Sequence, residues 1–242
     1  LDEHGDVENA YVQVVEFRGF ERFCQGRPVE EMLLITPRIC GVCPWAHHMA
    51  SAKATDALYD VRAPDTARKL RELACNASYV HDHSAVFYFL SAPDFVVGTH
   101  APRAERNVLG MANKLGADVV KGLEVLGGRS VHPTFCLPGG VSRALTEEER
   151  RKMERYAKEL VEFGQSTLRF LEQAVLTNED YVRLVADEAC RHQTYYMSVV
   201  GDDGKADYYD GDLKIVEPGG KDFLRFSPEM YFDHIAEHVE DW

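Results

Sequence analysis

The sequence predicts a mainly α-helical (α+β) fold, with a bundle core of long helices and small antiparallel β additions. Several long stretches combine helix-forming residues with apolar residues at helical spacing. A glycine- and proline-rich segment, residues 127–140, separates two of these stretches and forbids continuous helix. Short segments with the composition of β-strands, joined by tight turns, come only after residue 194.

The first half of the chain is predicted to hold one strand and then three helices. Residues 11–17 are rich in valine and aromatic residues with partial alternation, which indicates a strand. Small residues dominate residues 44–59, so we expect a buried helix there. Residues 64–90 and 101–126 are expected to form long helices, the former with Pro64 in its first turn. Apolar residues recur along it at Leu70, Leu73, Val80 and Ala85.

The second half is predicted to begin with the loop at 127–140 and a third long helix at 147–175. Strands are expected at residues 194–200, 206–209 and 213–216, and a last helix at 228–242. The sequence has no internal repeat or low-complexity linker, so residues 1–242 are expected to form a single domain. Neither end carries the turn or capping glycine that would close it, so we expect this domain to be partial.

The composition of the chain excludes several classes of function. The chain has 242 residues, 45% of them hydrophobic, which is enough for a globular core. With 27 basic and 40 acidic residues, its net charge of -13 repels phosphate backbones and anionic lipids. Residues 1–9 are acidic and polar, unlike a secretory signal, and the sequence has no long apolar run. We therefore expect a cytoplasmic protein with no nucleic-acid partner and no membrane insertion.

The richest segment for chemistry is Arg38-Ile39-Cys40-Gly41-Val42-Cys43-Pro44-Trp45-Ala46-His47. Pro44 suits the first position of a helix, which places Cys43 at the helix entry and Cys40 in the turn before it. The helix dipole, with Arg38 close by, favours thiolates, which bind soft metals. His47 lies one turn further along, where its imidazole can hydrogen-bond a sulfur or bind the metal. We predict that both sulfurs converge on one interior half-site.

Three other interpretations of this segment stay open. A CxxC pair at a helix start is typical of thioredoxin-like redox proteins, although these need a preceding strand and have no use for Arg38 or His47. A structural zinc site needs four ligands, commonly as two pairs, and no second CxxC follows. Two buried, inert cysteines are the third interpretation, which leaves the arginine and the helix-start proline unexplained.

A family resemblance follows from this segment together with its surroundings, which include Glu16-Phe17-Arg18-Gly19-Phe20-Glu21 and Gly26-Arg27-Pro28. Together they resemble the first cysteine motif of nickel-iron hydrogenase large subunits. The resemblance implies that Cys40 is a terminal nickel ligand and that Cys43 bridges nickel and iron. It also implies that His47 supports the bridging sulfur and that Glu21 binds magnesium or a similar hard cation.

Further stretches resemble the same family. His81-Asp82-His83-Ser84-Ala85-Val86-Phe87-Tyr88-Phe89-Leu90-Ser91-Ala92-Pro93-Asp94 resembles its histidine- and aromatic-rich helix end. Gly127-Gly128-Arg129-Ser130-Val131-His132-Pro133 with Pro138-Gly139-Gly140 resembles a loop that faces the proximal cluster of the small subunit. His132 is therefore a candidate cofactor-binding residue, with packing as the alternative. Residues 195–197 and 208–211 resemble the soluble, cofactor-coupled branch.

The resemblance implies a catalytic large subunit that reversibly oxidises dihydrogen to protons and electrons. Its catalytic candidates are Cys40, Cys43, His47 and Arg38, around a nickel-iron centre with diatomic ligands on iron. The implied direct partner is an iron-sulfur small subunit, with flavin, nicotinamide, deazaflavin or bifurcating electron-transfer subunits beyond it.

Two features of this family have no counterpart in the sequence. The second cysteine pair is absent, because the cysteines after Cys43 are single, and the proton-shuttling glutamate would precede Leu1. Since four thiolates hold the centre, we expect the N-terminal half of a large subunit, inactive alone. The alternatives are a non-catalytic structural relative, although such relatives lose the cysteines, and a zinc or redox module that uses Cys40, Cys43 and His47.

Overall fold

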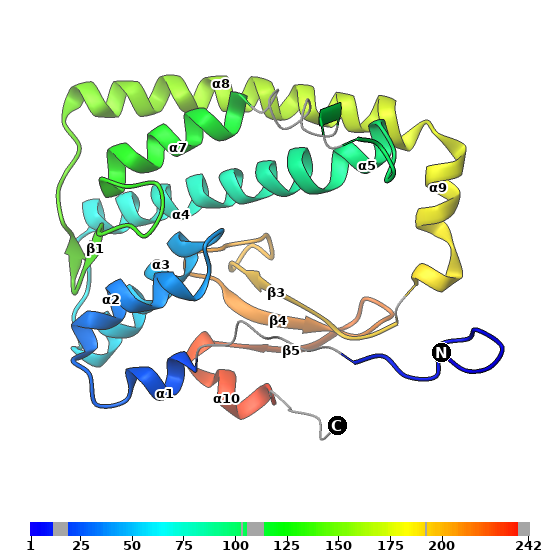
Figure 1. Cartoon of the computed structure of the whole chain (residues 1–242). Coiled ribbons are helices and arrows are strands. Elements are labelled where there is room, and N and C mark those ends of the chain that lie inside the picture. Colours follow the sequence, from blue (N-terminus) through cyan, green and yellow to red (C-terminus); the bar gives the residue numbers. More distant parts are fainter. Residues whose placement is uncertain (12–18, 103, 106–113, 192, 237–242) are drawn as a thin grey trace.

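A computed structural model describes residues 1–11, 19–102, 104–105, 114–191 and 193–236 of the chain. The fold is mainly helical with small antiparallel sheets, as the sequence predicts (Figure 1). The strand expected at 11–17 and parts of the helix expected at 101–126 lie outside the described residues. No helix among the described residues is long and apolar enough to cross a membrane.

Four short helical segments lead into the helix that carries the cysteine pair. Helix α3 (Pro44–Leu58) begins at the proline, as expected, and buries one face while the other is exposed. The segments before it are α1 (Phe20–Cys24), the 3-10 helix η1 (Val29–Glu31), α2 (Met32–Ile35) and the 3-10 helix η2 (Thr36–Ile39).

Helix α4 (Asp65–Ala85) continues through the π-helical segment η3 (Val86–Ser91) into α5 (Ala92–Val96). The expectation for Pro64 was wrong by one position, because its extended backbone (φ -55°, ψ 154°) makes it the N-cap. Its periodic apolar residues do not all face the core either, since Leu73 and Val80 are exposed. The buried face consists of Ala67, Arg71, Ala74, Cys75 and Ser78, most of which are small enough for close helix contact.

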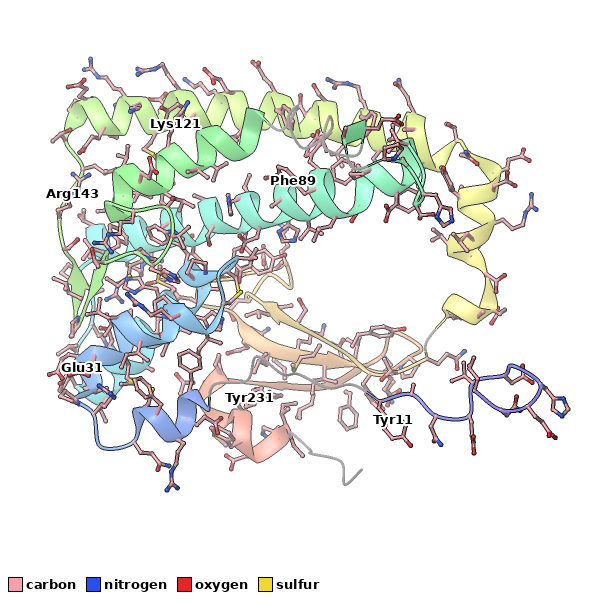
Figure 2. The ribbon with its side chains drawn as sticks, viewed as in Figure 1. Tyr11, Glu31, Phe89, Lys121, Arg143 and Tyr231 are labelled. Atoms are coloured by element: carbon pink, nitrogen blue, oxygen red, sulfur yellow. The ribbon has the colours of Figure 1, made fainter. Side chains whose placement is uncertain are left out.

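Helices α7 (Lys114–Gly127) and α8 (Glu147–Leu171) pack with α4 into one layer (Figure 1). A capping box between Thr146 and Glu149 starts α8. Figure 2 shows the charged side chains of α8 projecting away from the molecule, with Arg143 near its start. After α8 follow the π-helical η4 (Glu172–Leu176), α9 (Glu179–Ala186) and η5 (Glu188–Cys190).

The β structure is smaller than the sequence suggests in one place and larger in another. Residues 206–209 form no strand, because the Asp207 carboxylate accepts the backbone N–H groups of Tyr209 and Asp210 and folds them into a turn. Strand β5 was not predicted. The pairs are β1 (Cys136–Leu137) with β2 (Gly140–Val141), and β3 (Tyr196–Val200) with β4 (Asp212–Val216) and β5 (Asp222–Phe226).

The helix expected at 228–242 is much shorter in the structure. The 3-10 helix η6 (Pro228–Met230) leads into α10 (Tyr231–His234), and Ile235 has an extended backbone that ends it. Residues 237–242 lie outside the described residues.

The core lies where α3, α4 and α7 meet the loop after α7. Its largest side chains include Trp45 on α3, Leu123 on α7 and Phe135 in the loop, all at most 3% exposed. A Cβ atom on Gly127 would lie 2.6 Å from the Trp45 ring, so only glycine fits at this crossing. The start of α3 is therefore packed directly against the loop at 127–140.

A buried ion pair ties the same elements together. Arg71 on α4 is 1% exposed and pairs with Asp56 on α3. Its Nη2 also donates to the carbonyl oxygens of Leu137 and Gly140, at 2.8 Å each. The Asp56 carboxylate in turn accepts the backbone N–H of Gly139 at 2.7 Å. This network satisfies a guanidinium that burial would otherwise destabilise strongly.

Replacing Asp56 with alanine should therefore destabilise the protein more than removing an exposed carboxylate. Asp56→Ala leaves the Arg71 charge buried and unpaired, which should lower the free energy of unfolding by about 3 to 5 kcal/mol. Urea unfolding followed by circular dichroism measures this value. Glu159→Ala on the exposed face of α8 is the matched control, and equal losses in the two variants would contradict the role of the pair.

Candidate metal centre

The two cysteines of the CxxC pair lie in the short connection between η2 and α3. Cys43 is the N-cap of α3 with Pro44 as its first residue, and Cys40 has an extended backbone (φ -133°, ψ 133°) directly after η2. The backbone N–H of Cys43 donates to Cys40 Sγ at an N···S distance of 3.3 Å. The helix start therefore turns the chain so that both sulfurs lie on one side.

The structure brings Cys40, Cys43 and His47 together. Both Sγ atoms and a ring nitrogen of His47 all lie within 4.8 Å of one another, and each residue is half-buried. Within the described part of the chain, no other three His, Cys, Asp or Glu residues are grouped this closely. The convergence of the two sulfurs agrees with the sequence prediction. Two sulfurs and an imidazole are donors that soft transition metals prefer, so these residues fit nickel, iron or zinc.

The two thiols do not titrate alike, which corrects the expectation of two thiolates. Hydrogen bonds from the Cys43 side chain and backbone lower the pKa of Cys40. Burial raises the pKa of Cys43 to about 11, and the hydrogen bond to Cys40 and the charges of Cys40 and Asp82 add to the rise. Without a metal, one proton is therefore shared by the pair and resides mainly on Cys43.

Arg38 is anchored away from the role that the sequence suggested. Its side chain is exposed, and Nη1 donates to the backbone carbonyl of Leu34. The causes of the lowered Cys40 pKa are hydrogen bonds from Cys43 and Val42 rather than a neighbouring guanidinium. Its expected electrostatic effect on the sulfurs is thus replaced by local hydrogen bonds.

Two adjacent histidines on α3 have different surroundings. His47 faces the cysteines, whereas His48 is fully buried. The Nδ1 of His48 lies 2.9 Å from the Leu33 carbonyl, and its Nε2 accepts the backbone N–H of Cys136 at 2.9 Å. Burial lowers the pKa of His48, so its ring stays neutral with the proton on Nδ1. Sequence analysis missed this anchor, since nothing local distinguishes it from His47.

The loop that contains His132 reaches the start of α3. Trp45 Nε1 donates to the Ser130 carbonyl at 2.8 Å, which fixes the loop beside the cysteine segment. His132 has a left-handed backbone (φ 54°), and its buried Nδ1 has no hydrogen-bond partner in the structure. Such strain is uncommon outside glycine and often accompanies a functional position.

Glu21 lies apart from the ligand grouping. It is exposed in the first turn of α1, and the set formed by Cys40, Cys43 and His47 does not include it. Its assignment to magnesium therefore stays a prediction.

Asp82 on α4 is an acidic neighbour of the cysteine pair that sequence analysis did not single out. Its charge raises the pKa of both Cys40 and Cys43. The carboxylate also lies 2.9 Å from Nδ1 of His81. His83 instead contacts the Tyr79 carbonyl one turn earlier, as a helix-packing histidine would.

Comparisons with known proteins agree with this site. Residues 18–117 match the model of the family described as nickel-dependent hydrogenase. The full chain is 45% identical to the iron-sulfur subunit of the F420-non-reducing hydrogenase of Archaeoglobus profundus and covers 52% of it. About 99% of the chain is 40% identical to the vhu subunit of the F420-non-reducing hydrogenase of Methanocaldococcus jannaschii, of which it covers 58%.

Solved structures give the same result for the fold. The crystal structure of an NAD+-reducing [NiFe]-hydrogenase matches the full chain with a TM-score of 0.88 and 33% identity. The match covers 55% of that hydrogenase chain. The chain thus spans between half and three fifths of the length of each of these similar proteins.

Proposed function

The chain is similar to the nickel-dependent hydrogenases, and from this premise we propose that it is the N-terminal half of a catalytic nickel-iron hydrogenase large subunit. The proposed reaction is the reversible oxidation of dihydrogen to protons and electrons. The observation that carries the proposal is the convergence of two cysteine sulfurs and one histidine at the start of α3. The proposed location is the cytoplasm.

The residues of the site have distinct proposed roles toward the metal centre. Cys40 is the terminal nickel ligand and Cys43 the bridging ligand, while His47 supports a sulfur from one helical turn away. The centre, with diatomic ligands on iron, would supply the Lewis-acid and redox chemistry that cleaves dihydrogen when bound. Two further ligands would have to come from chain beyond the residues that this sequence supplies.

The surroundings of the site suit its proposed role. The thiol of Cys43 keeps its proton more tightly than that of Cys40, so metal binding must displace a proton from Cys43. Trp45 and the buried His48 fix the helix start to the loop and to α2, which limits movement of the ligands. Ligands held on such a rigid frame keep their geometry through catalysis.

The relatives are subunits of multisubunit hydrogenases, and one solved neighbour reduces NAD+. We propose that the direct partner is an iron-sulfur small subunit, with flavin, nicotinamide, deazaflavin or bifurcating modules beyond it. The proposed contact surface includes the loop at 127–140 and the region of Arg27. Exposed apolar side chains in and near these parts, Phe23, Ile39, Val42 and Val131, support this surface. Within it, His132 faces the partner's cluster.

A zinc or redox module is the second candidate function, favoured by the three-ligand set itself. Three protein ligands leave the fourth zinc position open, as in catalytic zinc sites. A non-catalytic structural subunit has less support, because both cysteines and their convergence are retained.

Serine in place of either cysteine should abolish dihydrogen oxidation in the full-length enzyme. A serine hydroxyl stays protonated near neutral pH and is a hard, poor ligand for nickel. His47→Ala should keep the metals and lower activity by roughly 10- to 100-fold. Dihydrogen uptake with an artificial dye, normalised to nickel content, measures both effects. Cys24→Ser is the control, and full activity per nickel in the Cys43→Ser enzyme would remove the site from catalysis.

The partner surface can be tested separately with two exposed valines. A charge at Val131, which is 45% exposed in the loop, should weaken binding of the small subunit by about tenfold or more, because the carboxylate loses its water on binding. Co-purification of tagged small subunit with the Val131→Asp protein measures the loss. Val161→Asp on α8 is the matched control, and a loss confined to that variant would place the interface elsewhere.

A further inference from the structure

We propose that Cys40 and Cys43 form a disulfide with each other when no metal holds them, so that the metal site is also a site of reversible thiol oxidation. The inference rests on the geometry of the cysteine segment and does not require that the metal be nickel. It therefore goes beyond the hydrogenase proposal and can fail or succeed independently of it.

The distance between the sulfurs is short enough for bond formation. Both Sγ atoms belong to a group of ligand atoms that lie within 4.8 Å of one another, and the Cys43 backbone N–H already contacts Cys40 Sγ. A disulfide needs an S–S distance of about 2 Å. Side-chain rotation and a small backbone adjustment can close the remaining gap.

The segment between the cysteines can make that adjustment without breaking a helix. Residues 40–43 lie between η2 and α3, so none of them is within a helix. A Cβ atom at Gly41 would meet nothing within 4 Å, and Val42 is 58% exposed. The ring that a disulfide closes therefore contains exposed, loosely packed backbone.

The other described cysteines lack a comparable partner or access to solvent. Cys75 and Cys136 are 6% and 2% exposed, and burial raises their pKa values to about 11 and about 12. The nearest sulfur recorded for Cys136 is the Met49 thioether, at 3.9 Å. Cys24 is half-buried on α1 and belongs to no grouping of ligand residues. Oxidation should therefore select the pair at 40 and 43 among the described cysteines.

The oxidant for this step is a small-molecule disulfide. One cysteine thiolate of the pair attacks a sulfur of that disulfide, forms a mixed disulfide and releases one small thiolate. The second cysteine, as its thiolate, then attacks the protein sulfur and releases the second small thiol. Two electrons pass from the protein thiols to the small disulfide, and the two thiol protons end on the two released thiols. The oxidised pair carries no thiolate, so it cannot bind metal until it is reduced.

Thiol mapping tests the proposal on the full chain. The protein is reduced, freed of metal with a chelator, treated with glutathione disulfide, alkylated and analysed by peptide mass spectrometry. The peptide spanning residues 40–43 should lose two hydrogen atoms and resist alkylation, while Cys75 and Cys136 are alkylated only after unfolding. Zinc added before glutathione disulfide should protect the pair and leave both thiols free on later acidification.

Matched variants separate ring closure from simple reactivity. Cys40→Ser and Cys43→Ser should each stop at a mixed disulfide with glutathione, whereas Cys24→Ser should form the internal disulfide like the unmodified protein. Full alkylation of both thiols after oxidation, a stable mixed disulfide in the unmodified protein, or pairing with Cys24 would each overturn the proposal. A protein that forms this disulfide but never takes up nickel would contradict only the hydrogenase proposal.

Discussion

The buried ion pair between Arg71 and Asp56 is the constraint on which the rest of the structure depends. It joins α4 to α3, and through the carbonyl groups of Leu137 and Gly140 it also holds the β1–β2 hairpin. A charged pair at this position costs solvation energy, which is offset only while all of its hydrogen bonds are made. The pair therefore favours one arrangement of these three elements, and the start of α3 with its two cysteines is positioned by that arrangement.

Sequence analysis located the site because its signals are local. Proline at the first position of a helix and cysteines three residues apart determine where the helix begins and where the sulfurs lie, and α3 begins at Pro44 as expected. The capping box of α8 is equally local. The convergence of Cys40, Cys43 and His47 follows from the geometry of one turn and needs no distant contact.

The features that sequence analysis missed all depend on contacts between distant residues. Arg71 would be placed on the surface by its charge, and only Asp56, 15 residues earlier in the chain, explains its burial. His48 likewise depends on Cys136, 88 residues away. The thiol of Cys43 keeps its proton because burial and Asp82 on α4 oppose its charge, which the local helix dipole alone does not predict. The turn at residues 206–209 resembled a strand because the hydrogen bonds of Asp207 are not visible in an apolar pattern.

The central claim is that Cys40, Cys43 and His47 belong to a nickel-iron centre, and the metal content of the full-length protein tests it most directly. Protein purified without oxygen from cells supplied with nickel would be analysed for nickel, iron and zinc by mass spectrometry, beside a Cys40→Ser, Cys43→Ser double variant. The account predicts nickel and iron together in the unmodified protein and loss of nickel from the double variant. Zinc alone, no metal, or equal nickel in both proteins would contradict it.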